Sequence, residues 1–174
     1  GYASPSSPQR WGMVNQDLAV IESGTGLKTK SESKMWRMAV ALHPIQNKTY
    51  VDFQIENNPA SSERGLIFGI VSKEDLEGIT DTGMHFGKCK GGFGWESNGG
   101  ILSGYGGKYI EMPKKAHQHD HSVGMWVDLE KGVLQFFFDR KKHGPTHHLG
   151  KHFGKEMYIA VAIDSKKVEI NANF

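Results

Sequence analysis

Residues 123–138 read VGMWVDLEKGVLQFFF, and this stretch decides the fold class. Two runs rich in β-branched and aromatic residues, 123–129 and 133–138, flank the short polar segment Glu130-Lys131-Gly132. Such runs around a glycine, which adopts the positive φ of a tight connection at little cost, are typical of a β-hairpin. The stretch therefore predicts two adjacent antiparallel strands.

Further strand patterns precede this hairpin. Residues 50–55 alternate so that Val51, Phe53 and Ile55 point one way, and residues 36–42 alternate in the same manner, with Trp36, Met38, Val40 and Leu42 on one face. Alternation of this kind predicts half-buried strands. Residues 66–71 are apolar on both faces, which favours a central strand covered on each side.

The remaining segments complete an all-β pattern. Residues 158–163 and 168–174 form a last pair of strands, joined by a polar turn at 164–167, and residues 72–78 predict a single helical turn or a loop. The 22 glycines are scattered between short strand-like runs, and helix-period apolar stretches are missing. We therefore expect an antiparallel two-sheet β-sandwich with eight or more strands.

Composition limits the domain count and the partners. The chain has 174 residues, enough for one domain with a full core, which we expect at 11–174 after a Ser/Pro-rich linker or extension at 1–10. Because 21 basic and 19 acidic residues give a net charge of only +2, we expect neither nucleic acid nor a membrane surface as partner. The lone Cys89 indicates a reducing, cytoplasmic compartment.

Four segments resemble, in order, the motifs of the SPRY family, the domain that also forms the core of PRY–SPRY modules. Gly69-Ile70-Val71 is similar to the family's Gly-Val/Ile-Ala/Val strand, and Phe93-Gly94-Trp95-Glu96 to its Trp-Gly-Trp-Asp block. Residues 123–144 are similar to the Ile-Gly-Val hairpin with its following Asn/Asp and Gly, and 170–174 to the closing strand that usually reads Asn-Phe-Gly. The resemblance is best over 64–174.

The resemblance implies a sandwich of the concanavalin-like jelly-roll type that binds a peptide segment of a partner protein through loops at one rim. It implies no catalytic residue and no cofactor, so we expect no enzyme, and we expect a monomeric domain. The matching positions are the loop after Trp95 and the turn between the last two strands, with two positions from the N-terminal third. The implied partner-binding residues are Ser103, Tyr105, Asp164, Ser165, Lys166, Arg64 and Lys30. For Tyr105, partner binding and packing against the sheet stay equally open.

His117, His119 and His121 form the one pattern with metal-ligand spacing, because alternate residues of a strand share a face. A structural zinc site takes four ligands, so His147, His148 or His152 would have to join them. The stretch follows Pro113 and precedes the strand at 123, where a solvated loop is the favoured interpretation. We therefore expect no metal.

Two other patterns favour ordinary loops over catalysis. The glycine-rich segments 91–94 and 104–108 are not followed by a helical pattern, which a phosphate-binding loop requires. Cys89 stands between Lys88 and Lys90, which would lower the pKa of its thiol, but no catalytic motif surrounds it and a plain loop thiol is favoured.

The leading hypothesis is thus an intracellular protein-interaction module. The first alternative is a carbohydrate-binding, lectin-like module, since lectin sandwiches share the architecture and stack sugars on exposed Trp or Tyr. The second is a zinc enzyme centred on the histidines. The sequence does not identify the partner or the architecture of a longer parent protein.

Overall fold

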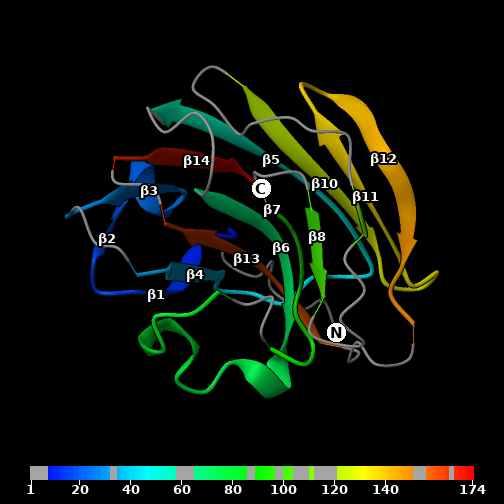
Figure 1. Cartoon of the computed structure of the whole chain (residues 1–174), viewed down its shortest axis with the longest axis horizontal. Coiled ribbons are helices and arrows are strands. Elements are labelled where there is room, and N and C mark those ends of the chain that lie inside the picture. The colour runs from blue at the N-terminus through cyan, green and yellow to red at the C-terminus, as the bar shows by residue number, and fades with distance from the viewer. Residues whose placement is uncertain are drawn as a thin grey trace, which may run out of the picture.

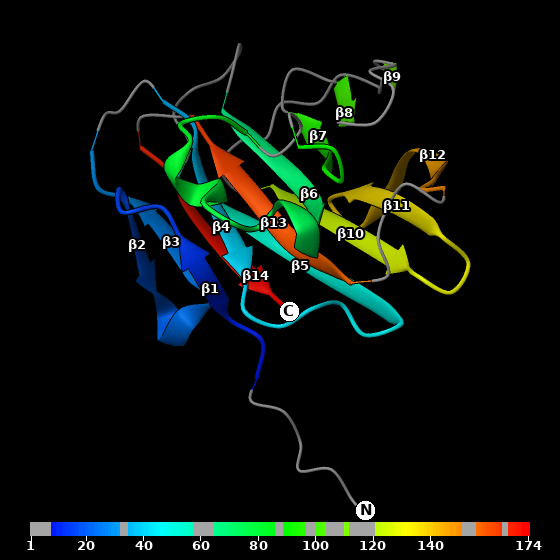
Figure 2. The ribbon, with the colours of Figure 1, turned by 90° about the horizontal axis from the view of Figure 1, so that it is seen from below.

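The computed structural model describes residues 8–31, 35–57, 65–85, 89–96, 100–103, 110–111, 121–150, 156–164 and 167–174. Within them, two antiparallel sheets of seven strands pack face to face (Figures 1 and 2). Sheet A has the order β1-β4-β13-β6-β7-β8-β9, and sheet B the order β12-β11-β10-β5-β14-β3-β2. The predicted β-sandwich is confirmed.

The strands of sheet A are β1 (Trp11–Val14), β4 (Arg37–Ala41), β13 (Met157–Ile163), β6 (Leu66–Ser72), β7 (Phe93–Glu96), β8 (Gly100–Ser103) and β9 (Ile110–Glu111). The strands of sheet B are β12 (Lys141–His148), β11 (Val133–Phe138), β10 (Ser122–Asp128), β5 (Lys48–Asn57), β14 (Glu169–Asn173), β3 (Gly26–Thr29) and β2 (Leu18–Ile21). Three single 3-10 turns complete the described elements, η1 (Glu22–Gly24), η2 (Lys73–Asp75) and η3 (Ile79–Asp81). The turn predicted within 72–78 is therefore η2.

The hairpin that decided the fold class is β10–β11. Val123 pairs with Phe138 and Asp128 with Val133, in unbroken antiparallel register. Gly132 has φ of 65°, the left-handed conformation that favours glycine in such a connection.

The core lies between the two sheets. Val51, Phe53 and Ile55 of β5 are fully buried there, as their alternation predicted. Aromatic rings join the sheets, with ring centroids 4.7 Å apart for Phe53 and Phe68 and 5.6 Å apart for Trp95 and Phe136. Each such side chain contributes about 1.5–3 kcal/mol when it leaves water.

Sheet A is covered on its outer face as well. A second apolar cluster forms on that face around Met38, Val40 and Ile67, and the segment that carries η2 and η3 packs on it through Ile79 (Figure 2). The prediction that β4 is half-buried is therefore wrong, because all five of its residues are buried. Leu42, which the alternation placed with them, lies beyond the strand and is exposed.

The last two strands do not pair with each other. β13 lies between β4 and β6 in sheet A, whereas β14 lies between β5 and β3 in sheet B. The predicted pair at 158–163 and 168–174 is correct as two strands, but the chain crosses from one sheet to the other between them. Both strands are apolar enough to be central, and a hairpin cannot be distinguished from a crossover by their alternation alone.

Gly69 shows why the Gly-Ile-Val segment begins with glycine. It pairs with Ala160 on one side and Gly94 on the other. A Cβ atom at this position would collide with the carbonyl oxygen of Phe93 and the backbone of Gly94. The absence of a side chain lets β6 and β7 approach at this point.

Candidate functional site

One end of sheet A gathers several segments that are distant in sequence. β4 begins at Arg37, β6 begins at Leu66 and β13 ends at Ile163, and Ile163 is in register with both of the others. The backbone N–H of Asp164 donates a hydrogen bond to the carbonyl of Gly65, 2.8 Å away. We call this end of sheet A, with Lys30 and Ser31 beside it, the rim.

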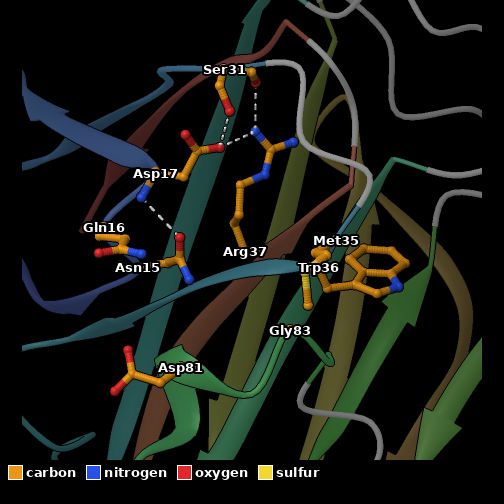
Figure 3. Close-up of a pocket in the computed structure, with 9 residues that line it drawn as sticks. All are labelled: Asn15, Gln16, Asp17, Ser31, Met35, Trp36, Arg37, Asp81 and Gly83. Carbon is orange, nitrogen blue, oxygen red and sulfur yellow. Dashed lines mark hydrogen bonds and ion pairs between the residues drawn. The ribbon is translucent and has the colours of Figure 1, made fainter.

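A buried ion pair holds the rim together. Nη1 of Arg37 lies 3.0 Å from Oδ2 of Asp17, and only 2% of the Arg37 side chain is exposed (Figure 3). The Ser31 hydroxyl donates to the same Asp17 oxygen at 2.8 Å, and Nη1 of Arg37 also donates to the Ser31 carbonyl at 3.0 Å. A buried charge is stable only when paired and hydrogen-bonded, so these three residues fix one another's positions.

The turn between β1 and β2 is fastened to this network. The side-chain oxygen of Asn15 accepts a hydrogen bond from the backbone N–H of Asp17, the local turn that asparagine favours. The Asn15 amide donates to the carbonyl of Thr80 at 2.6 Å, and Nζ of Lys30 donates to the carbonyl of Gln16 at 3.1 Å. The turn therefore connects the rim to the segment that covers sheet A.

A cleft of about 750 Å³ opens at this point, and Figure 3 shows the side chains around it. Met35, the first residue after the undescribed part of the β3–β4 connection, is 58% exposed, although methionine is an apolar side chain. The ring of Trp36 packs edge-on against His85, with centroids 5.2 Å apart. We call this the rim cleft, and its lining residues are Asn15, Gln16, Asp17, Ser31, Met35, Trp36, Arg37, Asp81 and Gly83.

The chemistry of the rim cleft is suited to binding. Its walls combine an apolar part, Met35 and Trp36, with polar groups that include the exposed carboxylate of Asp81. The charge of Asp17 is already neutralised by Arg37. A rigid floor with an exposed apolar side chain above it is the arrangement of an interface anchor site.

The structure places part of the predicted site at the rim. Lys30 and Asp164 both lie there, because the backbone N–H of Lys30 donates to the carbonyl of Asp17 and Asp164 follows Ile163. Tyr105, Ser165, Lys166 and Arg64 lie outside the described residues, as does Tyr109.

Ser103 lies away from the rim along the strand direction of sheet A. It is in register with Phe93, which pairs with Ile70, which in turn pairs with Ile159. Ile159 precedes Ile163 by four positions, or about 13 Å along a strand. Ser103 therefore does not stand in the row of strand ends that forms the rim.

The rim cleft itself was not predicted. Asp17 and Arg37 are 20 residues apart, and an isolated aspartate and an isolated arginine give no local pattern. The one signal available was an arginine at the start of a strand whose other residues are all apolar. Such a charge needs a buried partner, but the sequence does not say which one.

The expectation of no metal site stays a prediction, because His117, His119 and His152 lie outside the described residues. Within the described segments, no three metal-ligating side chains gather. Nδ1 of His121 lies 2.8 Å from the carboxylate of Asp139. His147 is buried against Phe93 and Phe136, and burial, with a smaller effect of His148, lowers its pKa from 6.5 to about 4.

The pKa of the Cys89 thiol is raised, whereas the two neighbouring lysines suggested a lowered pKa. Burial against the outer face of sheet A, with a smaller contribution from the charge of Asp75, raises its pKa to about 11. This direction is opposite to the lowering considered from the sequence for Lys88 and Lys90, because burial disfavours the thiolate. The nearby glycines do not form a phosphate loop, since Phe93 directly begins strand β7.

Comparison with known proteins identifies the fold. No protein-family profile and no curated protein sequence matches the chain. The solved SPRY domain of human HERC1 aligns over 90% of this chain and 92% of its own, with a TM-score of 0.70 and 12% identity. The PSpry domain of TRIM65 covers 95% and 89%, with a TM-score of 0.67 and 13% identity.

A third structure extends the similarity. The NEUZ (NHR) domain of Neuralized from Drosophila melanogaster aligns over 99% of this chain and 95% of its own, with a TM-score of 0.61 and 11% identity. The class that these results define is the SPRY-type β-sandwich. The chain has this fold, as its four motifs indicated. Among the residues described, no helix is long and apolar enough to span a membrane.

Proposed function

We propose that this domain is a protein-interaction module that binds a peptide segment of a partner protein at the rim and the rim cleft. The observation that carries the proposal is the 58% exposed Met35 beside Trp36, over a floor fixed by the buried Arg37–Asp17 pair. A rigid scaffold that presents a few anchoring side chains is the usual design of such surfaces. The resemblance to SPRY domains supports the same function.

The chemistry of the rim cleft suggests the kind of segment. An apolar side chain of the partner would pack on Met35 and Trp36, and a basic side chain or backbone N–H would reach the exposed Asp81 carboxylate. Lys30 and Asp164 stand at the rim, and Arg64, Ser165 and Lys166 adjoin described rim residues in sequence. Tyr105 and Ser103 remain part of the proposal on the resemblance. We further propose that the domain is monomeric, cytoplasmic and without catalytic activity.

A peptide selection tests this proposal. Random peptides displayed on phage are selected against the domain, and the dissociation constants of the selected peptides are measured by calorimetry for wild type and variants. Met35→Ser and Asp81→Asn should each weaken binding by about tenfold, or about 1.4 kcal/mol. Met13→Ser, which changes an exposed methionine of β1 outside the cleft, should leave binding unchanged.

Two further variants test the loops. Asp164→Ala and Tyr105→Ala should weaken binding while the melting temperature stays within a few degrees of wild type. Selected peptides that bind Met35→Ser, Asp81→Asn and Asp164→Ala as tightly as wild type would place the interaction elsewhere. Loss of melting temperature for Tyr105→Ala with unchanged binding per folded molecule would make that tyrosine structural.

A further inference from the structure

Two methionines give the rim cleft an exposed, sulfur-containing surface. Met35 lines the cleft and is 58% exposed, and Met84, the residue after the lining Gly83, is 48% exposed. These two are the most exposed of the large apolar side chains in the described part of the chain. The surface that we propose for the partner peptide is therefore bordered by two thioethers in contact with solvent.

The two methionines lie on adjacent segments, although they are far apart in sequence. A Cβ atom at Gly83 would collide with the terminal methyl group of Met35, and Figure 3 shows the Met35 thioether extending toward Gly83. The residues that follow the two methionines also meet, because the rings of Trp36 and His85 pack edge-on with centroids 5.2 Å apart. Two independent contacts thus bring the segments of Met35 and Met84 together.

An exposed thioether is open to one specific covalent change. A hydroperoxide transfers an oxygen atom to the sulfur, so that the sulfur loses two electrons, the O–O bond breaks and, with hydrogen peroxide, water is released. The product, methionine sulfoxide, is polar where the thioether was apolar and flexible. Oxidation of Met35 and Met84 would therefore replace the apolar part of the rim cleft with a polar surface.

Other sulfur atoms of the described residues are protected or lie elsewhere. Met38, Met125 and Met157 are at most 1% exposed. Burial raises the pKa of the Cys89 thiol to about 11, and the protonated thiol is a poor nucleophile toward peroxide. Met13 is 37% exposed, but it belongs to β1 outside the cleft. Mild oxidation should therefore reach the rim cleft before it reaches the core.

We propose that Met35 and Met84 form a modification site, at which oxidation to methionine sulfoxide by a hydroperoxide releases the partner peptide from the rim cleft. The proposal rests on the proposed function of that cleft. The buried Arg37–Asp17 pair beneath it contains no sulfur, so oxidation changes the binding surface and leaves its rigid floor in place. The change is reversible, because two thiols reduce the sulfoxide, forming a disulfide and releasing its oxygen as water.

The test begins with the order of oxidation. The domain is treated with dilute hydrogen peroxide, which catalase and desalting then remove, and mass spectrometry of proteolytic fragments measures the sulfoxide at each methionine. Met35 and Met84 should be oxidised at least about tenfold faster than the buried Met38, Met125 and Met157. The melting temperature at the point of full Met35 and Met84 oxidation should stay within a few degrees of the reduced domain.

Binding is then measured by calorimetry, with peptides selected at the rim cleft that contain no methionine, cysteine or tryptophan. The oxidised domain should bind them about tenfold more weakly than the reduced domain, as expected for loss of an interface anchor. Treatment with methionine sulfoxide reductases A and B and dithiothreitol should restore the affinity, since each enzyme reduces one epimer of the sulfoxide.

Two variants assign the effect to the cleft. Met35→Leu/Met84→Leu keeps apolar side chains of similar volume but has no sulfur there to oxidise. With peptides selected on that variant, the ratio of the dissociation constants after and before peroxide should be close to 1, against about ten for wild type. The matched control is Met13→Leu, which removes an exposed methionine outside the cleft and should lose affinity on oxidation as wild type does.

Four outcomes would overturn the proposal. Met35 and Met84 could be oxidised no faster than Met38, or the double variant could lose as much affinity as wild type, which would assign the effect to another residue. Peptides that Met35→Ser weakens could bind the oxidised domain at full affinity, which would refute the modification site alone. If Met35→Ser weakened no selected peptide, the proposed function would fail and the modification site with it.

Discussion

The guanidinium of Arg37, at the start of a central strand, is bound to the Asp17 carboxylate at 3.0 Å with only 2% of the arginine side chain exposed. Removing one partner of such a pair leaves a buried charge uncompensated. We expect Asp17→Ala to lower the free energy of unfolding by about 3–5 kcal/mol, measured by urea denaturation. The double variant Asp17→Ala/Arg37→Met should cost less than the sum of the two single changes, because no buried charge remains.

The control is the exposed ion pair between Lys28 and Glu169, whose Lys28 side chain is 57% exposed. Lys28→Ala should cost less than about 1 kcal/mol. Equal losses for Asp17→Ala and Lys28→Ala would contradict the view that the rim is held by its buried pair.

The low pKa of His147 predicts a loss of stability in mild acid. Its pKa is about 4 in the folded protein and about 6.5 when exposed, so the unfolded chain binds the proton more tightly. Stability is therefore fully present above pH 6.5 and falls as the pH drops toward 4, by about 1–2 kcal/mol when partial solvation is allowed for. Thermal unfolding of His147→Leu between these pH values should show a shallower decline, whereas the exposed His148→Gln should follow wild type.

Gly69 predicts a large effect of a single methyl group. Gly69→Ala would place Cβ against the backbone of Phe93 and Gly94, which cannot move aside as a flexible side chain can. We expect a loss of several kcal/mol, in the upper range for overpacked positions, or failure to fold. Gly78→Ala is the control, because a Cβ there meets no atom within 4 Å and only its φ of 67° is strained, at about 1 kcal/mol.

Cys89 should be a slow nucleophile. With its pKa raised to about 11 from the ordinary 9.0, it carries about 100-fold less thiolate at pH 8. Ellman's reagent should accordingly react with the folded protein far more slowly than with the same protein in urea. Equal rates would show that the thiol is not desolvated on the outer face of sheet A.

Removal of metal should leave the domain unchanged. A structural zinc contributes folding free energy directly, so a chelator would lower the melting temperature if His117, His119 and another histidine bound one. We expect the same melting temperature with and without EDTA. A decrease that added zinc reverses would restore the zinc hypothesis.

The fold was predictable because its signals are local. Alternation in β5, the glycine between β10 and β11 and the doubly apolar β6 each report the face that a strand buries. Two predictions were wrong, the half-buried β4 and the pairing of β13 with β14. The alternation of a single strand reveals neither its neighbouring strands nor what covers the sheet. Met38 and Val40 are covered by a segment about 40 residues later in the chain.

The sites were less accessible to sequence analysis. The partner-binding roles of Lys30 and Asp164 stay predictions from the resemblance, and the Arg37–Asp17 pair depends on a contact between distant segments. Burial of a polar group is a property of the assembled sheets.

The positions of β13 and β14 bear on how the chain is made. Each of these late strands lies in the middle of a sheet, between strands that precede it by roughly a hundred residues. During synthesis, β4 and β6 in one sheet and β3 and β5 in the other therefore keep unpaired edges until residues 157–174 have left the ribosome. Such edges pair readily with other chains, so the incomplete sandwich is most exposed to aggregation before β13 and β14 are in place.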